Sequence, residues 1–153
     1  MANTYSQLYI QLVFAVKGRQ QLINGDWKSE LNKYISGIIT NQGHKSINVN
    51  GMPDHIHAFI GLNPAKNISD LVREMKSESS NYINSRKLLQ GKFNWQGGYG
   101  AFSYSESQVQ QVYNYIENQE LHHQKKTFRE EYYGLLKAFN INYEEKYLFD
   151  FLD

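Results

Sequence analysis

Residues 51–62 read "GMPDHIHAFIGL", and this stretch decides the fold that the sequence predicts. Its first residues include a glycine and a proline, which suit the turn of a β-hairpin. The residues after them alternate as a strand does, so that His55 and His57 share one face while Ile56 lies on the other. The preceding segment, residues 45–50, also has the character of a strand. We therefore predict a hairpin with two histidines on one face.

Apolar spacing predicts the elements on either side of this hairpin. Residues 4–17 alternate with a period of two, whereas residues 24–43 and 67–89 repeat at helical spacing. Residues 99–105 form a further short strand. We expect Asp26 to be the N-cap of the first helix and Gly43 to end it, and we expect Asn67 to be the N-cap of the second helix.

The order strand, helix, strand, strand, helix, strand predicts an α+β fold. It matches a ferredoxin-like (RRM-like) βαββαβ unit, in which an antiparallel sheet carries both helices on one face. Capping-box patterns at 105–108 and 127–130 predict added C-terminal helices, which are candidates to cover the free face with the histidines. We expect one domain over 1–153, with a core at about 4–104, a helix at about 106–123, and a C-terminal helix and tail at about 127–153.

The composition excludes several classes of protein. The chain has no cysteine, so disulfides and thiolate zinc sites are excluded and any metal must be held by His, Asp, Glu, Gln or Asn. No apolar stretch approaches the roughly 20 residues of a membrane span, and the first residues do not resemble a signal peptide. We therefore expect a cytoplasmic protein without a membrane partner. With 16 basic and 15 acidic residues, the chain is not suited to coating duplex DNA by charge alone.

The histidine pair has two interpretations. Two imidazoles that lie two residues apart on one strand face can converge on one divalent cation. They can equally be hydrogen-bonded histidines at the surface of a sheet. The His-x-His motif alone is weak, so a metal site requires a third ligand from elsewhere in the chain.

The predicted helix at 106–123 supplies candidates for that ligand and for a reacting group. Tyr115 and Gln119 are four residues apart and therefore lie one turn from each other, beside an apolar seam in which we expect Tyr113 to be buried. The Gln119 carbonyl oxygen can ligate a hard cation such as Mg²⁺ or Mn²⁺. The Tyr115 phenol can attack the phosphorus of a phosphodiester that such a cation polarises. An amphipathic helix with solvated polar residues is the alternative.

Several stretches resemble one family closely. Residues 52–60, "MPDHIHAFI", resemble the His-hydrophobic-His motif of the HUH endonucleases. Residues 115–119, "YIENQ", resemble the nucleophile helix of the single-tyrosine HUH transposases of small insertion sequences. Residues 93–105 and 122–132 are also similar to that family, so the resemblance covers nearly the whole chain.

This resemblance implies a function, a cofactor and a partner. Such proteins act as dimers that use Mg²⁺ or Mn²⁺, without a nucleotide cofactor, to cut and rejoin single-stranded DNA at the hairpin ends of a mobile element. By the resemblance, His55, His57 and Gln119 are metal ligands. Tyr115 is then the catalytic nucleophile, which bonds to a 5′ phosphate and releases a 3′ hydroxyl. The tyrosine helix of one subunit can serve the histidine pair of the other, so assembly in cis or in trans stays open.

Other polar residues are candidates for contact with DNA. His122 and His123 follow the tyrosine motif and are candidate outer-sphere groups or metal ligands, although we favour contact with phosphate or solvent. Basic side chains are candidates for phosphate contacts, with solvated surface charge as the alternative for each. They are Arg73, Lys76, Arg86, Lys87, Lys92, Lys125, Lys126 and Arg129.

Two other functions compete with the transposase interpretation. One is a DNA-hairpin-binding protein that descends from such an enzyme and is inactive. The other is a metal-dependent phosphodiesterase that uses His55 and His57 without a covalent step. The presence of all the inferred active-site residue types favours the active transposase.

Overall fold

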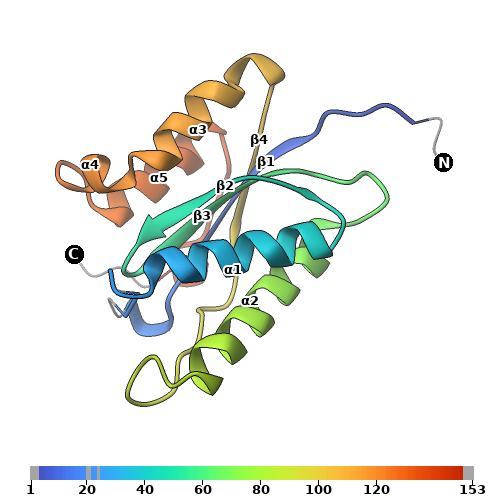
Figure 1. Cartoon of the computed structure of the whole chain (residues 1–153). Coiled ribbons are helices and arrows are strands. Elements are labelled where there is room, and N and C mark those ends of the chain that lie inside the picture. Colours follow the sequence, from blue (N-terminus) through green and yellow to red (C-terminus); the bar gives the residue numbers. More distant parts are fainter. Residues whose placement is uncertain (1–3, 20–21, 24, 150–153) are drawn as a thin grey trace.

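The structure is a computed structural model that describes residues 4–19, 22–23 and 25–149. Its elements follow the predicted order (Figure 1). The strands are β1 (Tyr9–Ala15), β2 (Lys45–Met52), β3 (His55–Gly61) and β4 (Gly100–Tyr104). The α-helices are α1 (Lys28–Asn41), α2 (Ile68–Ser85), α3 (Val109–Glu117), α4 (Gln119–His123) and α5 (Phe128–Ala138). Short 3-10 helices are η1 (Lys17–Arg19), η2 (Glu106–Gln108) and η3 (Glu145–Tyr147).

The strands form one antiparallel sheet in the order β2-β3-β1-β4, which confirms the predicted ferredoxin-like arrangement. In the middle of the sheet, Val13 of β1 lies opposite His57 of β3 and, on its other side, opposite Gly100 of β4. The histidine pair is therefore placed on a central strand, away from the sheet edges.

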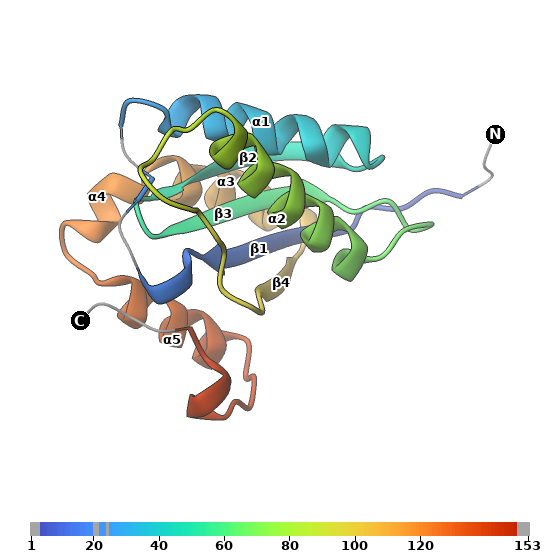
Figure 2. The same cartoon turned by 90° about the horizontal axis from the view of Figure 1, so that it is seen from below.

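Helices α1 and α2 pack on one face of the sheet, as predicted (Figures 1 and 2). The apolar residues of β1 and β3 that point to this face are buried against them. Burial of such side chains contributes about 1.5–3 kcal/mol each to folding, so this layer fixes which way each strand faces. The main members of this core are Leu12, Phe14, Ile56, Ile60, Leu31, Ile35, Leu71 and Met75.

Helices α3, α4 and α5 lie on the opposite face of the sheet (Figure 1). A small core of Phe59, Val112 and Ile116 joins α3 to β3. A second core, centred on Phe102 and Tyr132, joins α5 to β1 and β4. The C-terminal helices therefore cover the face that carries the histidines, and they leave the pair between two apolar clusters.

Helices α1, α2 and α5 end in the same way. The N–H groups of the two residues after each C-cap bond back to carbonyls of the last turn, which is the Schellman arrangement. This arrangement requires a positive φ directly after the C-cap. The residues that adopt it are Gly43 (90°), Lys87 (53°) and Asn140 (56°). Gly43 thus ends α1 as expected, whereas α2 ends at Ser85 rather than near residue 89.

Two other predicted helix features differ from the structure. The N-cap of α1 is Trp27 rather than Asp26. The helix expected at 106–123 is divided into η2, α3 and α4, with a break at Asn118. The amide of Asn50 on β2 donates to the Ile116 carbonyl (2.9 Å) and to the Glu117 carbonyl (3.2 Å). These are carbonyls that a continuous helix would use for its next turn, so the break follows from docking on β2.

The expected caps of the other helices are present. Asn67 accepts a hydrogen bond from the Asp70 N–H at 2.8 Å, and the capping boxes at 105–108 and 127–130 both form. Within the described part of the chain, no helix combines the length and the apolar character that crossing a bilayer requires. Residues 1–3 and 150–153 of the predicted domain lie outside the described residues.

Candidate active site

The two histidines lie on the face of β3 that the C-terminal helices cover, and both side chains are fully buried. Each ring is oriented through its Nδ1 atom. His55 Nδ1 lies 2.7 Å from Asp54 Oδ1, and His57 Nδ1 lies 2.7 Å from Gln11 Oε1. Because the Nδ1 atoms have these partners, the Nε2 atoms of both rings are left to face the interior of the site.

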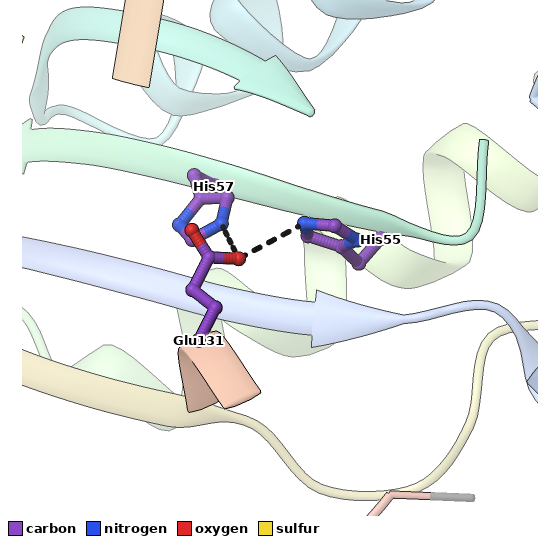
Figure 3. Close-up of side chains that lie close together, drawn as sticks. All are labelled: His55, His57 and Glu131. Atoms are coloured by element: carbon purple, nitrogen blue, oxygen red, sulfur yellow. Dashed lines mark hydrogen bonds and ion pairs between the residues drawn. The ribbon is translucent and has the colours of Figure 1, made fainter. Parts of the chain in front are cut away.

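Both Nε2 atoms face the same carboxylate, that of Glu131 on α5 (Figure 3). Glu131 Oε1 lies 3.3 Å from His55 Nε2 and 3.1 Å from His57 Nε2. One ligand atom from each of these residues lies within 4.8 Å of the others, and all three residues are buried. This cluster is compatible with a divalent metal site, because two imidazoles and a carboxylate are ligands that such ions accept.

Glu131 was not among the residues proposed from the sequence, although the sequence holds a signal for it. The capping box at 127–130 fixes the start of α5, and helical spacing then aligns Glu131 with an apolar stripe. An acid in such a stripe is buried when the helix docks. The docking of α5 brings Tyr132 close to the backbone of β4 at Gly100. A Cβ atom at Gly100 would lie 2.7 Å from the Tyr132 hydroxyl, so a side chain there would obstruct the docking. The stripe consists of Phe128, Glu131, Tyr132, Leu135 and Leu136.

The second oxygen of Glu131 contacts the residues proposed from the helix motif. Tyr115 donates a hydrogen bond from its hydroxyl to Glu131 Oε2, and Gln119 Nε2 donates to the same atom at 2.9 Å. The Gln119 amide oxygen lies 3.2 Å from His55 Nε2, and Gln119 is fully buried. The structure therefore brings His55, His57, Tyr115 and Gln119 together within one chain.

Tyr113 does not occupy the buried position that we predicted for it. Its side chain is 36% exposed, whereas Val112 and Ile116 form the buried side of α3. The prediction placed Tyr113 in one seam with Val112 and Ile116, but the apolar stripe that packs on Phe59 is narrower, and Tyr113 lies about 100° around the helix from Val112.

The histidines after the motif lie at the edge of the cluster. His123 Nε2 is 2.9 Å from Glu131 Oε1, and its side chain is only 8% exposed. The ring of His122 stacks on Tyr115, with centroids 4.4 Å apart. Phe128 stacks on His55 at 3.9 Å. His123 thus contacts the carboxylate, while His122 packs against the ring of Tyr115.

Burial and hydrogen bonding determine the charges in the site. Burial opposes a charge on His55, but its bonds to Asp54 and Glu131 outweigh that effect and raise its pKa to about 9. Burial lowers the pKa of His57. Burial alone would raise the pKa of Glu131, but the surrounding histidines hold it well below its usual range. Burial and the adjacent carboxylate raise the pKa of Tyr115, so the phenol keeps its proton at neutral pH.

The candidate DNA-binding residues fall into two groups. Lys125, Lys126 and Arg129 are exposed beside the site, and Lys126 lines a cavity next to Tyr115. The others lie on or after α2, which covers the opposite face of the sheet. Of these, Lys87 and Lys92 are exposed. The other three contact neighbouring groups: Arg73 pairs with Asp70 at 3.0 Å, and the Arg86 guanidinium carbon lies 4.7 Å from the centroid of the Tyr82 ring. The Lys76 ammonium donates to the backbone carbonyls of Gln96 and Gly98.

The chain is similar to known transposases over most of its length. The family model for IS200-like transposases matches residues 4–119. The ISDra2 transposase TnpA of Deinococcus radiodurans is 30% identical over 118 residues, which are 74% of this chain and 84% of that protein. The crystal structure of a putative transposase from Deinococcus radiodurans R1 has a TM-score of 0.63 at 28% identity, over 78% of this chain and 95% of that one.

A further solved structure supports the fold alone. A REP-associated tyrosine transposase, solved with a bound REP hairpin, has a TM-score of 0.59 at 16% identity, over 100% of this chain and 93% of that one. The segment that the family model matches contains His55, His57, Tyr115 and Gln119. Both the motifs and the sheet order agree with that match. The chain therefore belongs to the IS200-like family of transposases, the single-tyrosine HUH enzymes that its motifs resemble.

Proposed function

We propose that this transposase cleaves and rejoins single-stranded DNA at the ends of a mobile element through a covalent bond between Tyr115 and a 5′ phosphate. One observation carries the proposal: the Tyr115 hydroxyl and both histidine Nε2 atoms reach opposite oxygens of a single carboxylate, Glu131. A nucleophile and a group of metal ligands are thus held side by side, as a phosphoryl transfer requires.

His55, His57 and Glu131, with the amide oxygen of Gln119, would hold a divalent cation, which we propose to be Mg²⁺ or Mn²⁺. The donor set fits such an ion, because the ring atoms that point inward are the Nε2 atoms and the facing group is an ionised carboxylate. When bound, the cation supplies positive charge to the non-bridging oxygens of the scissile phosphate.

The proposed cleavage step exchanges one bond at phosphorus for another. The Tyr115 oxygen forms a bond to phosphorus, and the bond between phosphorus and the 3′ oxygen breaks, which frees a 3′ hydroxyl after that oxygen takes up a proton. The phenol proton has an acceptor in place, because Tyr115 already donates to Glu131 Oε2. The phosphotyrosine conserves the energy of the broken bond, so an incoming 3′ hydroxyl can reverse the step without a nucleotide cofactor.

We further propose that hairpins at the element ends are the DNA that this chain binds. The fold is shared with a tyrosine transposase that was solved with a bound REP hairpin. Lys125, Lys126 and Arg129 lie next to the site and suit phosphate contacts, and the basic residues of α2 provide a second surface. A homodimer is also part of the proposal, by resemblance to the family, and analytical ultracentrifugation tests it.

The decisive experiment incubates the protein with single-stranded DNA from the element ends and Mn²⁺, and then separates the products on a denaturing gel. We expect a protein–DNA adduct that is lost with Tyr115→Phe, with His57→Ala and with chelator. Tyr113→Phe is the matched control, because Tyr113 is exposed on the same helix. Cleavage of the DNA without an adduct would instead indicate a hydrolytic phosphodiesterase. Binding of the hairpin without cleavage and without an adduct would indicate a DNA-binding protein.

A further inference from the structure

We infer that a cavity between α3 and α5 binds the base of the nucleotide that flanks the scissile phosphate. This inference rests on the proposed function and names a substrate subsite for it. The cavity has a volume of about 350 Å³, which is within the range of small-molecule sites. Tyr115 and Glu131 form part of its wall, so a phosphate at the Tyr115 oxygen has its neighbouring nucleoside within reach of the cavity.

The lining of the cavity has the chemistry that recognises a base. Its lining includes Gln11 and Tyr104. The Gln11 amide is bonded at both ends, to the Tyr104 hydroxyl at 2.8 Å and to His57 Nδ1 at 2.7 Å, so it holds the wall in place and the Tyr104 ring is the part that a base can contact. The amides that suit a base edge come from the α3 side, namely Gln111 and the Nε2 group of Gln108, whose Oε1 accepts from Ser105 in the capping box. Amide groups carry both donors and acceptors and pair with base edges, while aromatic rings offer a stacking surface.

The edge of the cavity has a charge that suits a nucleotide. Lys126 lies in its lining and is exposed, so its ammonium can contact a phosphate next to the seated base. Glu131, also in the lining, is occupied by its bonds to histidines, Tyr115 and Gln119. The lining of the cavity thus combines an exposed cation, Lys126, with the amides of Gln108 and Gln111.

Gly134 supports the existence of a site here. It lies in the interior of α5, where glycine costs about 0.5–1 kcal/mol relative to alanine. A Cβ atom at this position would meet nothing within 4 Å, so no packing contact demands a glycine. Its lack of a side chain instead keeps the cavity wall open, because Gly134 is one of the lining residues.

Part of the cavity lies outside the segment that the family model matches. That segment ends at residue 119, whereas Lys126, Glu131 and Gly134 follow it. The subsite therefore depends on how α5 of this chain docks on β1 and β4.

The test titrates the full-length protein with deoxynucleoside 5′-monophosphates by NMR, and uses 2-deoxyribose 5-phosphate as the probe without a base. Gly134→Leu fills the cavity, and Gly37→Leu is its matched control. Gly37 is also an exposed glycine in the interior of a helix, α1, with nothing within 4 Å of a Cβ. Both substitutions replace glycine by a good helix former and should fold at least as well as the wild type.

We expect the nucleotides to bind the wild type and Gly37→Leu equally, and to bind Gly134→Leu about tenfold more weakly, which is the scale of one lost base contact. The sugar phosphate should bind the wild type as weakly as the nucleotides bind Gly134→Leu. Equal nucleotide binding by Gly134→Leu, equal binding of the sugar phosphate, or no binding of any nucleotide would overturn the inference.

If Gly134→Leu fails to fold, Gln111→Ala decides by the same comparison, since Gln111 is an exposed residue of the lining. The readout does not depend on cleavage. If the protein binds nucleotides but forms no adduct, the subsite is supported and the proposed covalent function is wrong. If it forms an adduct but binds no nucleotide, the covalent function is supported and the subsite is wrong.

Discussion

At the scale of single residues, the two oxygens of Glu131 have different partners. Oε1 faces three histidines, whereas Oε2 accepts hydrogen bonds from Tyr115 and Gln119. The carboxylate therefore links the proposed metal ligands to the proposed nucleophile. Its position is the reason that the residues of two separate motifs form one site.

Glu131→Gln should keep the fold, because the amide has the same shape, but it should slow adduct formation by roughly 10²-fold or more through loss of the charge and of the proton acceptor. The initial rate of adduct formation is measured at several Mn²⁺ concentrations. Glu130→Gln is the matched control and should react at the wild-type rate, since Glu130 is exposed and its capping oxygen is retained. An unchanged rate in Glu131→Gln would show that the carboxylate serves folding alone.

Lys76 gives a dependence of stability on pH. Burial lowers the pKa of its ammonium to about 8, below the value of about 10.4 for an unfolded lysine. Between these values the unfolded chain binds more protons than the folded chain, so a rise in pH favours folding through this group. The free energy of unfolding of the wild type should therefore increase between pH 8 and 10 relative to Lys76→Met. Urea titrations at each pH measure the difference, and parallel curves would contradict the expectation.

At the scale of the elements, the ends of the helices show where the chain is strained. Lys87 adopts a φ of 53° after α2, a region that costs a residue with a Cβ about 1–2 kcal/mol. Asn140 holds the same position after α5, and asparagine tolerates it better. Gly43 meets the requirement after α1 without strain.

Lys87→Gly should therefore raise the free energy of unfolding by about 0.5–1 kcal/mol, after the added entropy of the unfolded glycine is subtracted. Urea denaturation measures this change. The comparison variant is Lys92→Gly, which removes another exposed lysine whose φ is not positive. If both variants lose stability equally, the strain at Lys87 is absent.

The docking of α3 on β2 is the second feature at this scale. Asn50 binds the carbonyls of Ile116 and Glu117, which follow Tyr115 directly. The polar residues of β2 thus set the position of the phenol. Sequence periodicity did not indicate this, because hydrogen bonds between β2 and α3 depend on how the two elements meet in space.

Asn50→Ala should lower stability by about 1 kcal/mol and slow adduct formation, because the end of α3 loses its anchor. The concentration of Mn²⁺ that gives half of the maximal rate should stay the same, because Asn50 lies opposite His57 only as a backbone partner in the sheet, and the substitution keeps that pairing. The measurement is the rate of adduct formation as a function of Mn²⁺. Asn50→Asp offers a sharper comparison, because a carboxylate cannot donate to the two carbonyls and should not restore the rate.

At the scale of the whole molecule, the sequence predicts the layers better than it predicts the site. The strand and helix periods are local properties, and they gave the βαββαβ order and the face that carries the histidines. The motif spacing likewise selected Tyr115 and Gln119. Glu131 was missed because its place depends on long-range packing of α5 against Phe102 of β4. Tyr113 was misplaced because local spacing does not show how narrow the contact between α3 and Phe59 of β3 is.

The cover that α3 and α5 form over the sheet also bears on the order in which the components assemble. The histidines are fully buried, whereas the cavity next to Tyr115 reaches Glu131. DNA seated in that cavity would stand between solvent and the carboxylate, so the cation should enter before the strand does. Mixing Mn²⁺ with the protein first should give adduct at once, and adding DNA first should give a lag that stopped-flow or rapid-quench sampling can detect. Such a lag would make cation loading a slow step that precedes each encounter with DNA.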